Sequence, residues 1–581
     1  MIDQPPAWVY KRDGRRVPFE ADKISRALFA ATETLGQPDA FVARELTDGV
    51  LHFLSAEADH DPLTTTQVAD LVIKVVRELG QPALSQVFEE FGRRRALTGP
   101  KSAPCESKQA VAGPDQAILQ EIASLLDNPS AASDPRGLLW RTGEVSLGSY
   151  ALREVFARDL VAAHQDGLLT LPGREAPLEL AALVLGQEEP RRKELVETLE
   201  EARRWAGNLV ALDGPEYGWF APASDQGAVS FLRELGIGLR ATGLKGVLNL
   251  NSASVPPWAE ELGEGPLFAG QRSSLAADQA SARAALLRDR LFLPGARWDN
   301  LRLDWHLGER DWLPGKEDQL LPLARRAAEG APVSFVFDRL RRPVNLAEGL
   351  DRRHPTLLLR VGLHLPRFAQ QPGLRSDPDL FLHKLGSLAR LALSAAVQKR
   401  AFLKRYPRAW TGFLLDRARL IVVPVGLETV VQEVVGQGLC VGGAGLDFGR
   451  RIVQRLREVL ETDGQACRVD TAVDSAPNFF LPRAAEDQAA SSSSNSWVAG
   501  LTTWDAEASP RQQLRAAGLL HAAADLGTAA VLVPQEKPLV GEELVDLLRY
   551  AWHHTQVVRL RWLRVGPPPR QLVAPWEEAG P

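Results

Sequence analysis

The chain has 581 residues, of which 45% are hydrophobic and 24% are charged, as in an ordinary soluble globular protein. Its formal net charge is only −5, so the overall charge does not indicate DNA, RNA or a membrane surface as a partner, and a nucleic-acid site would have to be a local patch. The three cysteines, Cys105, Cys440 and Cys467, form no CxxC pair, which argues against a zinc ribbon and against a disulfide framework.

The N-terminal stretch predicts a hairpin followed by a helix. Asp13 and Gly14 stand between the apolar runs 8–10 and 17–19, which is a typical hairpin signal. Asp22 is in place to cap the helix that follows. Two further helical patterns are expected, and they cover 64–79 and 82–96.

The hairpin carries cations suited to a polyphosphate. Lys11 and Arg12 lie just before Gly14, where the missing side chain lets a ligand approach the backbone. Lys23 falls in the first turn of the next helix, where the N–H groups and the helix dipole favour an anion. A solvated basic hairpin with no ligand has the same spacing, and the spacing alone leaves both interpretations open.

The rest of the chain predicts an α/β fold. Residues 98–137 are rich in Pro, Ser, Ala and Gly and are interpreted as a linker. Beyond them, helical patterns alternate with short apolar runs, which indicates an α/β barrel or a large α/β sheet. The runs expected to form strands include 247–251, 333–337, 356–365, 420–427 and 529–534. A serine-rich stretch at 491–496 predicts a loop, and residues 567–581 predict a tail.

The opening pattern V-x-K-R-D-G-x-x-x-x-F-x-x-x-K-I resembles the ATP-cone, the nucleotide-sensing domain of ribonucleotide reductases and of their repressor. The segments TTTQVADLVIKVVRELG and VFEEFGRRRA resemble later helices of the same domain. The resemblance covers 8–97 and implies that the domain binds ATP or dATP, together with Mg²⁺. The nucleotide-binding residues that it implies are Val9, Lys11, Arg12, Asp13, Gly14 and Lys23.

The segment 138–566 resembles the barrel of the anaerobic, glycyl-radical ribonucleotide reductases. The likeness rests on several short stretches in the family's order, among them VGLHLPRFAQQP and VVPVGLETVVQEVVGQG. Three positions depart from the pattern: Thr170 and Pro172 stand where the family has His and Asp, and His364 stands where it has Asn. The resemblance implies a large α/β barrel like the ten-stranded reductase barrel.

This sequence lacks residues that the radical chemistry of that family requires. Asp338, before Arg339 and Leu340, occupies the position of the cysteine that becomes a thiyl radical, and a carboxylate cannot transfer a hydrogen atom as a thiol does. Gly566 leads into Pro567 and two more prolines instead of completing the family's R-V-x-G-Y motif. The four zinc-binding cysteines of the radical domain are also missing. We therefore expect that radical catalysis is lost.

Three other groups of candidate residues have both a structural and a functional interpretation. Cys440, in a glycine-rich stretch, is either a substitute thiol or a small buried residue, and burial is the better expectation. Glu428, Asp470 and Asp474 could form a carboxylate site. The neighbouring pair His553 and His554 is expected on a helix surface, because adjacent helical residues do not share a face.

The sequence as a whole predicts an ATP- or dATP-binding relative of the anaerobic reductases that acts as a nucleotide-responsive regulator or scaffold. Two alternatives stay open: an active reductase with a rewired radical site, and a nucleotide-responsive regulator that binds DNA or a protein. DNA is the less expected of those partners because the repressor's zinc ribbon has no counterpart. We expect a homo-oligomer modulated by nucleotide, with no metal cluster. No apolar run approaches the roughly 20 residues that span a bilayer, and the N-terminus has no signal core, so we expect a cytoplasmic protein.

Overall fold

The fold was examined in a computed structural model. It describes residues 6, 8–57, 63–98, 118, 123, 135–185, 195–217, 224–251, 277–292, 300–313, 315, 320–339, 342–347, 349–406, 413–474, 508–524, 526–534 and 541–565. Most of the expected linker, the serine-rich stretch, Cys105, Leu340, Gly566 and the tail lie outside these ranges. The chain divides into two compact units. Unit 1 comprises Met1–Leu178, Val361–Arg408 and Glu458–Val469, and unit 2 comprises Glu179–Arg360, Ala409–Arg457 and Asp470–Pro581.

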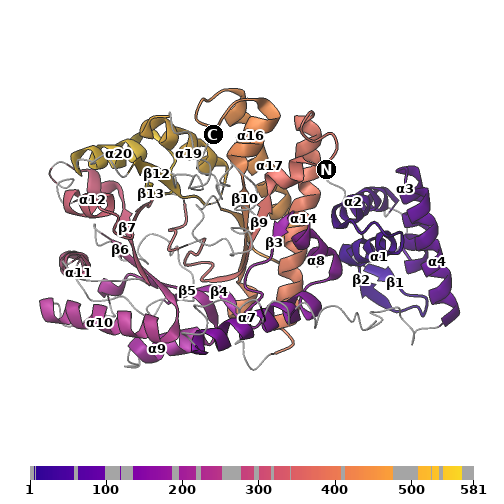
Figure 1. The fold of residues 1–581 in the computed structure, drawn as a ribbon, viewed down its shortest axis with the longest axis horizontal. Helices are drawn as coiled ribbons and strands as arrows, with labels where there is room; N and C mark the ends of the chain where they lie inside the picture. Colours follow the sequence, from indigo (N-terminus) through magenta and orange to yellow (C-terminus); the bar gives the residue numbers. More distant parts are fainter. Residues whose placement is uncertain are drawn as a thin grey trace, which may run out of the picture. The chain divides into compact units, whose positions relative to one another are not determined.

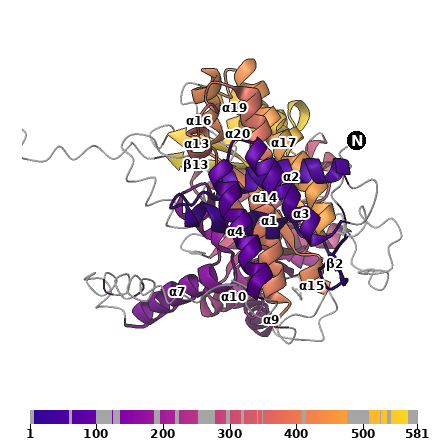
Figure 2. The same ribbon diagram turned by 90° about the vertical axis from the view of Figure 1, so that its right-hand side faces the viewer.

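Unit 1 begins with the predicted hairpin and four helices, drawn in indigo in Figure 2. Strands β1 and β2 pair antiparallel, with Val9 opposite Val17. A capping box between Thr64 and Gln67 starts α3, and its apolar side is buried, which explains why this segment forms a helix. The elements are β1 (Trp8–Tyr10), β2 (Arg16–Pro18), α1 (Ala21–Thr34), α2 (Ala40–Glu57), α3 (Thr65–Glu78) and α4 (Pro82–Thr98).

The prediction that Asp22 caps α1 is wrong. The N-cap position is held by Glu20, whose side chain makes no capping hydrogen bond, and Asp22 is the second residue of the helix. Its carboxylate instead accepts hydrogen bonds from Arg44 on α2 and from Ser394 on a helix of the C-terminal half of the chain. The Asp22 side chain therefore bonds to residues distant in the sequence and does not cap its own helix.

The second part of unit 1 is centred on the long helix α14. Asp377 caps this helix by accepting from the backbone N–H groups of Asp379 and Leu380. Helix α14 is long and apolar enough to cross a membrane, contrary to the sequence expectation, but 72% of its apolar window is buried, as in a core helix. The elements are α7 (Pro135–Glu154), α8 (Arg158–Gln165), β3 (Leu169–Thr170), α13 (Leu365–Ala369), α14 (Pro378–Leu403) and the end of α17 (Ala444–Cys467).

Most strands of the protein belong to one large sheet, which confirms the expected α/β barrel class. Its described strands follow the order β11-β10-β9-β4-β5-β6-β7-β8-β13-β12, and β3 pairs with β9 at the side. Strands β4 to β8 run parallel to one another, whereas β13 and β9 run antiparallel to β8 and β4. The strands are β4 (Leu180–Leu185), β5 (Ala206–Asp213), β6 (Lys245–Asn251), β7 (Leu301–Leu307), β8 (Val333–Phe337), β9 (Thr356–His364), β10 (Arg419–Val425), β11 (Thr471–Val473), β12 (Ala529–Pro534) and β13 (Arg559–Val565).

Helices cover the outer face of this sheet, as Figure 1 shows for α9 to α12, α19 and α20. The alternation along β7 explains the two faces: Leu301, Leu303 and Trp305 join the large outer core, and Arg302, Asp304 and His306 point to the other side. On β7, the inner face therefore carries the charged side chains. The covering helices are α9 (Leu195–Arg203), α10 (Asp225–Thr242), α11 (Ala277–Leu291), α12 (Leu321–Ala328), α16 (Leu427–Val435), α19 (Pro510–Ala523) and α20 (Gly541–His554).

Candidate functional site

The β1–β2 hairpin presents an exposed basic turn. The turn is closed by two backbone hydrogen bonds of 2.9 Å, from Lys11 N–H to the carbonyl of Arg15 and from Gly14 N–H to the carbonyl of Lys11. Gly14 adopts φ +78°, a left-handed conformation that favours glycine, and no atom lies within 4 Å of the position that a Cβ would take. Lys11 and Arg12 are both exposed. The turn therefore offers cations and an accessible backbone to a ligand.

The negative charge of Asp13 is paired with Arg15 within the same turn. Its carboxylate accepts from the Arg15 guanidinium at 2.7 Å and from the Arg15 backbone N–H at 3.1 Å. The hydrogen bonds from Arg15 lower the pKa of the Asp13 carboxyl. Asp13 is paired mainly with Arg15, and its charge also acts on Lys11, but the side chains of Lys11 and Arg12 remain exposed to an anion.

Lys23 and Val9 occupy different places around the hairpin. Lys23 is exposed in the first turn of α1, and its ammonium lies 2.8 Å from the Glu20 carboxylate. A phosphate would have to compete with Glu20 for this ammonium. The Val9 side chain is only 6% exposed, so Val9 can meet a ligand through its backbone alone.

The start of α3 also lies beside the hairpin. The sequence of the basic turn gives no sign of this contact. Tyr10 N–H donates to the carbonyl of Leu63 at 3.0 Å, and Tyr10 bridges to Thr64 in parallel fashion. Thr64 caps α3, so the positive end of that helix dipole is held next to β1. Only the tertiary pairing of residues more than fifty positions apart brings this helix end to the basic turn.

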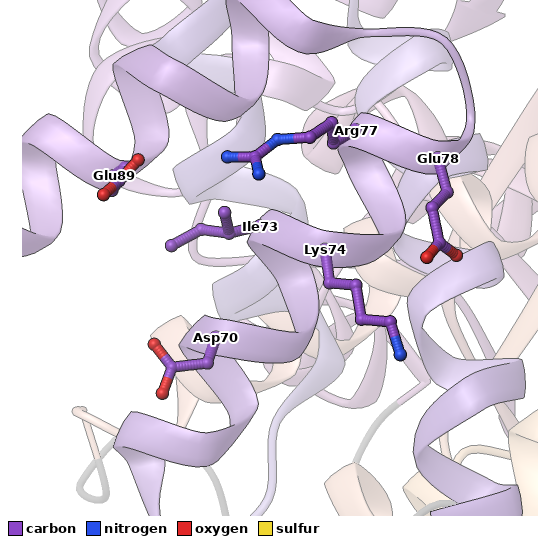
Figure 3. A pocket seen from close by; sticks show the side chains of 6 residues that line it. All are labelled: Asp70, Ile73, Lys74, Arg77, Glu78 and Glu89. Atoms are coloured by element: carbon purple, nitrogen blue, oxygen red, sulfur yellow. The ribbon is translucent and has the colours of Figure 1, made fainter.

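A separate cavity of about 400 Å³ lies on α3 and α4, and Figure 3 shows its lining. Three carboxylates and two cations line it, so its charge does not select a polyphosphate. Glu89 is in addition engaged by Arg93 on its own helix at 2.6 Å. The cavity contains none of the predicted nucleotide-binding residues, and it is lined by Asp70, Ile73, Lys74, Arg77, Glu78 and Glu89.

In unit 2, Asp338 is part of a hydrogen-bonded chain on the inner face of the sheet. It directly follows β8, and its carboxylate lies 3.0 Å from Nδ1 of His306. Nε2 of the same ring lies 3.0 Å from the amide oxygen of Asn249, whose nitrogen donates to the carbonyl of Leu212 at 3.0 Å. The position expected to correspond to the thiol is therefore occupied by a carboxylate that orients a buried histidine.

The segment between β8 and β9, residues 338–355, contains no cysteine. Ala347 and Leu350 are fully buried in an inner apolar cluster with strand residues such as Ile421. Gly349 has φ +93°, and a Cβ on it would lie 2.6 Å from Cδ1 of Ile421 and 2.8 Å from Cδ1 of Leu526. The segment thus fills the space inside the sheet with closely packed apolar groups.

Buried ion pairs fix the same segment to the sheet. Arg419 donates to the carbonyl of Gly349 at 3.2 Å and pairs with Asp351 at 3.0 Å. Burial would raise the pKa of Asp351, but the hydrogen bond from His354 and the charge of Arg419 lower it to about 2 overall. Arg352 holds Asp213 at 2.8 Å. Each of these charged groups is therefore already paired with another group of the protein.

A second charged cluster joins β7 and β13. Asp304, with a side chain that is fully buried, pairs with Arg559 at 2.9 Å and with Arg302 at 2.8 Å. Burial acts to raise the pKa of Asp304, and the charges of Arg302, Arg559 and Arg561 outweigh burial, so the pKa is lowered. Asp304 is therefore an ionised partner of the arginines, and it is not suited to act as a general acid.

The other candidate residues have structural partners. Cys440 is buried in the turn between α16 and α17, where Glu428 accepts from the backbone N–H of Leu439 at 3.0 Å. Asp474 pairs with Arg360 at 2.8 Å, whereas Asp470 lies 3.7 Å from Nε2 of His354. The three carboxylates therefore contact different partners and do not converge on one substrate position.

The histidine pair on α20 does not form a metal site. The ring of His553 packs against Trp312, and that of His554 packs against Tyr550. Across the described ranges, no group of three or more metal-ligating side chains comes together.

Thr170 and His364, two of the positions expected to depart from the reductase pattern, contact each other in unit 1. The Thr170 hydroxyl and Nε2 of His364 are 2.6 Å apart. Burial, with a smaller effect of His164, lowers the pKa of His364 to about 4, so its ring stays neutral and Nε2 can accept the hydroxyl proton. Thr170 and His364 are thus held together by one hydrogen bond.

The N-terminal part of the chain matches a known protein family. Residues 8–89 match the family model of the ATP cone domain. Among curated proteins, none matches this sequence.

Solved structures of anaerobic ribonucleotide reductases share the fold. One, described as an anaerobic ribonucleotide reductase, is 12% identical with a TM-score of 0.59, and the match covers 77% of this chain and 84% of the other. The Thermotoga maritima reductase with dATP in its specificity site gives 12% identity and a TM-score of 0.58, covering 77% and 86%. The same enzyme in complex with dATP and CTP gives 13% and 0.57, covering 77% and 90%. An ATP-cone at the N-terminus and a fold shared with the anaerobic reductases are therefore established.

Proposed function

We propose that the β1–β2 hairpin and the first turn of α1 bind ATP or dATP, with Mg²⁺ shared between phosphates and solvent. The observation that carries this proposal is the exposure of Lys11, Arg12 and Lys23 inside the segment that matches the ATP cone domain. Lys offers a mobile point charge and Arg a planar pair of donors, and together they neutralise a polyphosphate. Calorimetric titration of the full chain with ATP and dATP tests the proposal, and failure to bind either nucleotide would contradict it.

We further propose that the domains are 8–97 for the cone, 98–137 for a linker, 138–566 for the reductase-like barrel and 567–581 for a tail. The family match to 8–89 supports the first boundary. Limited proteolysis tests it, because a linker at 98–137 predicts early cleavage there and survival of the cone as a fragment.

The barrel, in this proposal, does not reduce ribonucleotides. Hydrogen abstraction from a ribose carbon needs a thiyl radical, and no cysteine lies between residues 338 and 355. Asp338 and His306 can hold and move protons, but neither can supply a radical of the required bond strength. Gly349 belongs to that segment, and the apolar side chains packed against it also occupy the space there. The barrel then acts as a scaffold or a nucleotide-responsive regulator.

The rival function, a rewired reductase, can be tested directly. Anaerobic incubation with the four ribonucleoside triphosphates, formate or a thiol reductant, and an activating enzyme should yield no deoxynucleotide. Deoxynucleotide that disappears in the Cys440→Ser variant would establish the rival. Burial of Cys440 in a turn between two helices, and not on the 338–355 segment, favours the scaffold.

The regulatory part of the proposal requires a change of state with nucleotide. A ligand shifts an assembly only when it binds two states with different affinity. Mass measurement in solution with ATP, with dATP and without nucleotide should give different oligomer distributions for this cytoplasmic protein. Identical distributions would restrict any regulation to the single chain.

A further inference from the structure

A continuous set of polar contacts connects the first turn of α1 with helix α14. The two carboxylate oxygens of Asp22 are held from different sides: Oδ1 accepts from Arg44 on α2 at 2.9 Å, and Oδ2 accepts from Ser394 on α14 at 2.6 Å. Arg44 has a side chain that is only 7% exposed. Asp22 and Ser394 are 372 positions apart in the sequence, so this contact joins the cone to the reductase-like part of unit 1.

Asp22 is the immediate neighbour of Lys23. Successive residues of a helix point about 100° apart, so Lys23 faces solvent and Asp22 faces α2 and α14. The Lys23 ammonium is paired with Glu20 at 2.8 Å, and Lys23 N–H donates to the carbonyl of Glu20 at 3.1 Å. A phosphate at Lys23 would compete with the Glu20 carboxylate, which belongs to the same helix start as Asp22.

The contacts on the α14 side continue deeper into unit 1. Ser394 also accepts from the Gln398 amide at 3.0 Å, and Gln398 in turn accepts from the backbone N–H of Ala157, at the start of α8, at 2.7 Å. Such hydrogen bonds have few alternative arrangements in a buried setting, which suits them to transmit a change between discrete states. A shift at Asp22 would therefore reach α8 as well as α14.

A neighbouring contact has similar chemistry but is one step further from the hairpin: Arg44, which pairs with Asp22, also lies 3.4 Å from the Asp48 carboxylate. Ser387, two turns earlier on α14, donates to Asp48 on α2 at 2.6 Å, and Arg390 pairs with Asp48 at 2.9 Å. Asp48 lies in the middle of α2, away from the chain positions of the basic turn. Ser387 therefore provides a matched control for Ser394.

We propose that Asp22 couples nucleotide binding at Lys23 to helix α14, and that the bound nucleotide and the Asp22–Ser394 hydrogen bond oppose each other. The coupling rests on the proposed function, because it requires that phosphates contact Lys23. Coupling between two sites is reciprocal, so loss of the contact must change nucleotide affinity by the same factor by which nucleotide weakens the contact. Asp22 acts as a positioning residue and does not itself touch the ligand.

Calorimetric titration with ATP and Mg²⁺ tests the coupling on the full chain. In the Ser394→Ala variant the opposing contact is gone, and ATP should bind about fivefold more tightly. The Ser387→Ala variant removes an equally short hydrogen bond to a cone carboxylate and should stay within about twofold of the wild type. As a second readout, ATP should speed amide hydrogen exchange around Ser394 in the wild type.

The outcomes separate the two proposals. Unchanged or weakened affinity in Ser394→Ala, or the same tightening in Ser387→Ala, overturns the coupling through Asp22. If the wild type binds ATP and Lys23→Ala weakens binding, these results leave the nucleotide site intact and remove only the coupling. If the wild type binds no ATP, the nucleotide site and the coupling both fail.

Discussion

The hairpin and the barrel interior use charged residues in opposite ways. At the hairpin, Lys11 and Arg12 project into solvent, and the nearby acidic side chain is engaged by Arg15. Inside the sheet, Arg559 and Asp304 are almost fully buried and face each other. A charge available to a ligand must be solvated or held apart from its counter-charge, whereas a charge that stabilises a fold must be paired. By this criterion, the hairpin is built to bind a ligand and the barrel interior is built to hold itself together.

The strongest way to break this comparison is to remove a buried partner. Asp304→Asn leaves Arg559, whose side chain is 1% exposed, without its counter-charge, and should destabilise the protein by about 3–5 kcal/mol. Urea unfolding followed by tryptophan fluorescence measures the shift. In the hairpin the matched change, Asp13→Asn, should leave the midpoint unaltered because that pair is exposed to solvent. Equal shifts in both variants would contradict the distinction.

Two glycines with similar backbone angles sharpen the comparison. Gly349→Ala adds strain at φ +93° and forces a methyl group against Ile421 and Leu526, so it should cost about 2–4 kcal/mol of unfolding free energy. Gly14→Ala adds comparable strain at φ +78°, but the new methyl group meets open space, and about 1 kcal/mol is expected. Chemical denaturation of both variants measures the difference. A Gly349→Ala variant as stable as Gly14→Ala would show that the segment is not tightly packed.

The barrel should also lose stability in acid. His521 is fully buried, its Nδ1 accepts from the backbone N–H of Val558, and burial lowers its pKa to about 3. The unfolded chain binds a proton as pH falls below its ordinary value of 6.5, and the folded chain does not until about 3. Stability is thus complete above pH 6.5 and declines toward pH 3, by about 2 kcal/mol at pH 5.

The variant His521→Gln tests this acid dependence. Glutamine keeps a hydrogen-bond acceptor for Val558 but does not titrate, so the decline in stability between pH 6.5 and pH 5 should become shallower. His52→Gln, a change at an exposed histidine of α2, is the control and should leave the pH dependence as it is in the wild type. If the two variants have the same pH profile, His521 is not the titrating group.

The smallest expected effect concerns the hairpin itself. Lys11→Ala and Lys23→Ala should each reduce ATP affinity roughly tenfold, about 1.4 kcal/mol, without lowering the melting temperature, because both side chains are exposed. Lys74→Ala, in the cavity on α3 and α4, is the control and should bind ATP normally. Calorimetry on the three variants measures this. Weakened binding in Lys74→Ala alone would move the nucleotide site to the cavity.

Local structure followed closely from local sequence. Three of the apolar runs expected to form strands lie in β6, β8 and β12, and the other two overlap β9 and β10 but extend one and two residues beyond them; the Asp-Gly turn lies between β1 and β2. Side-chain periodicity and turn residues act within about ten positions, so they can be read without knowledge of the fold. The charged turn of the hairpin belongs to the same category, because its cations, its glycine and the following helix start are all neighbours in the chain.

The partners of polar side chains were decided only by the tertiary structure. The sequence alone predicts that Asp22 lies at a helix start and, through the resemblance to the reductases, that Asp338 stands where that family has a cysteine. It could not show that Asp22 contacts Ser394, or that Asp338 orients a histidine that also meets Asn249. The physical reason is that a carboxylate accepts from any donor within about 3 Å, and the fold alone determines which distant donor arrives there.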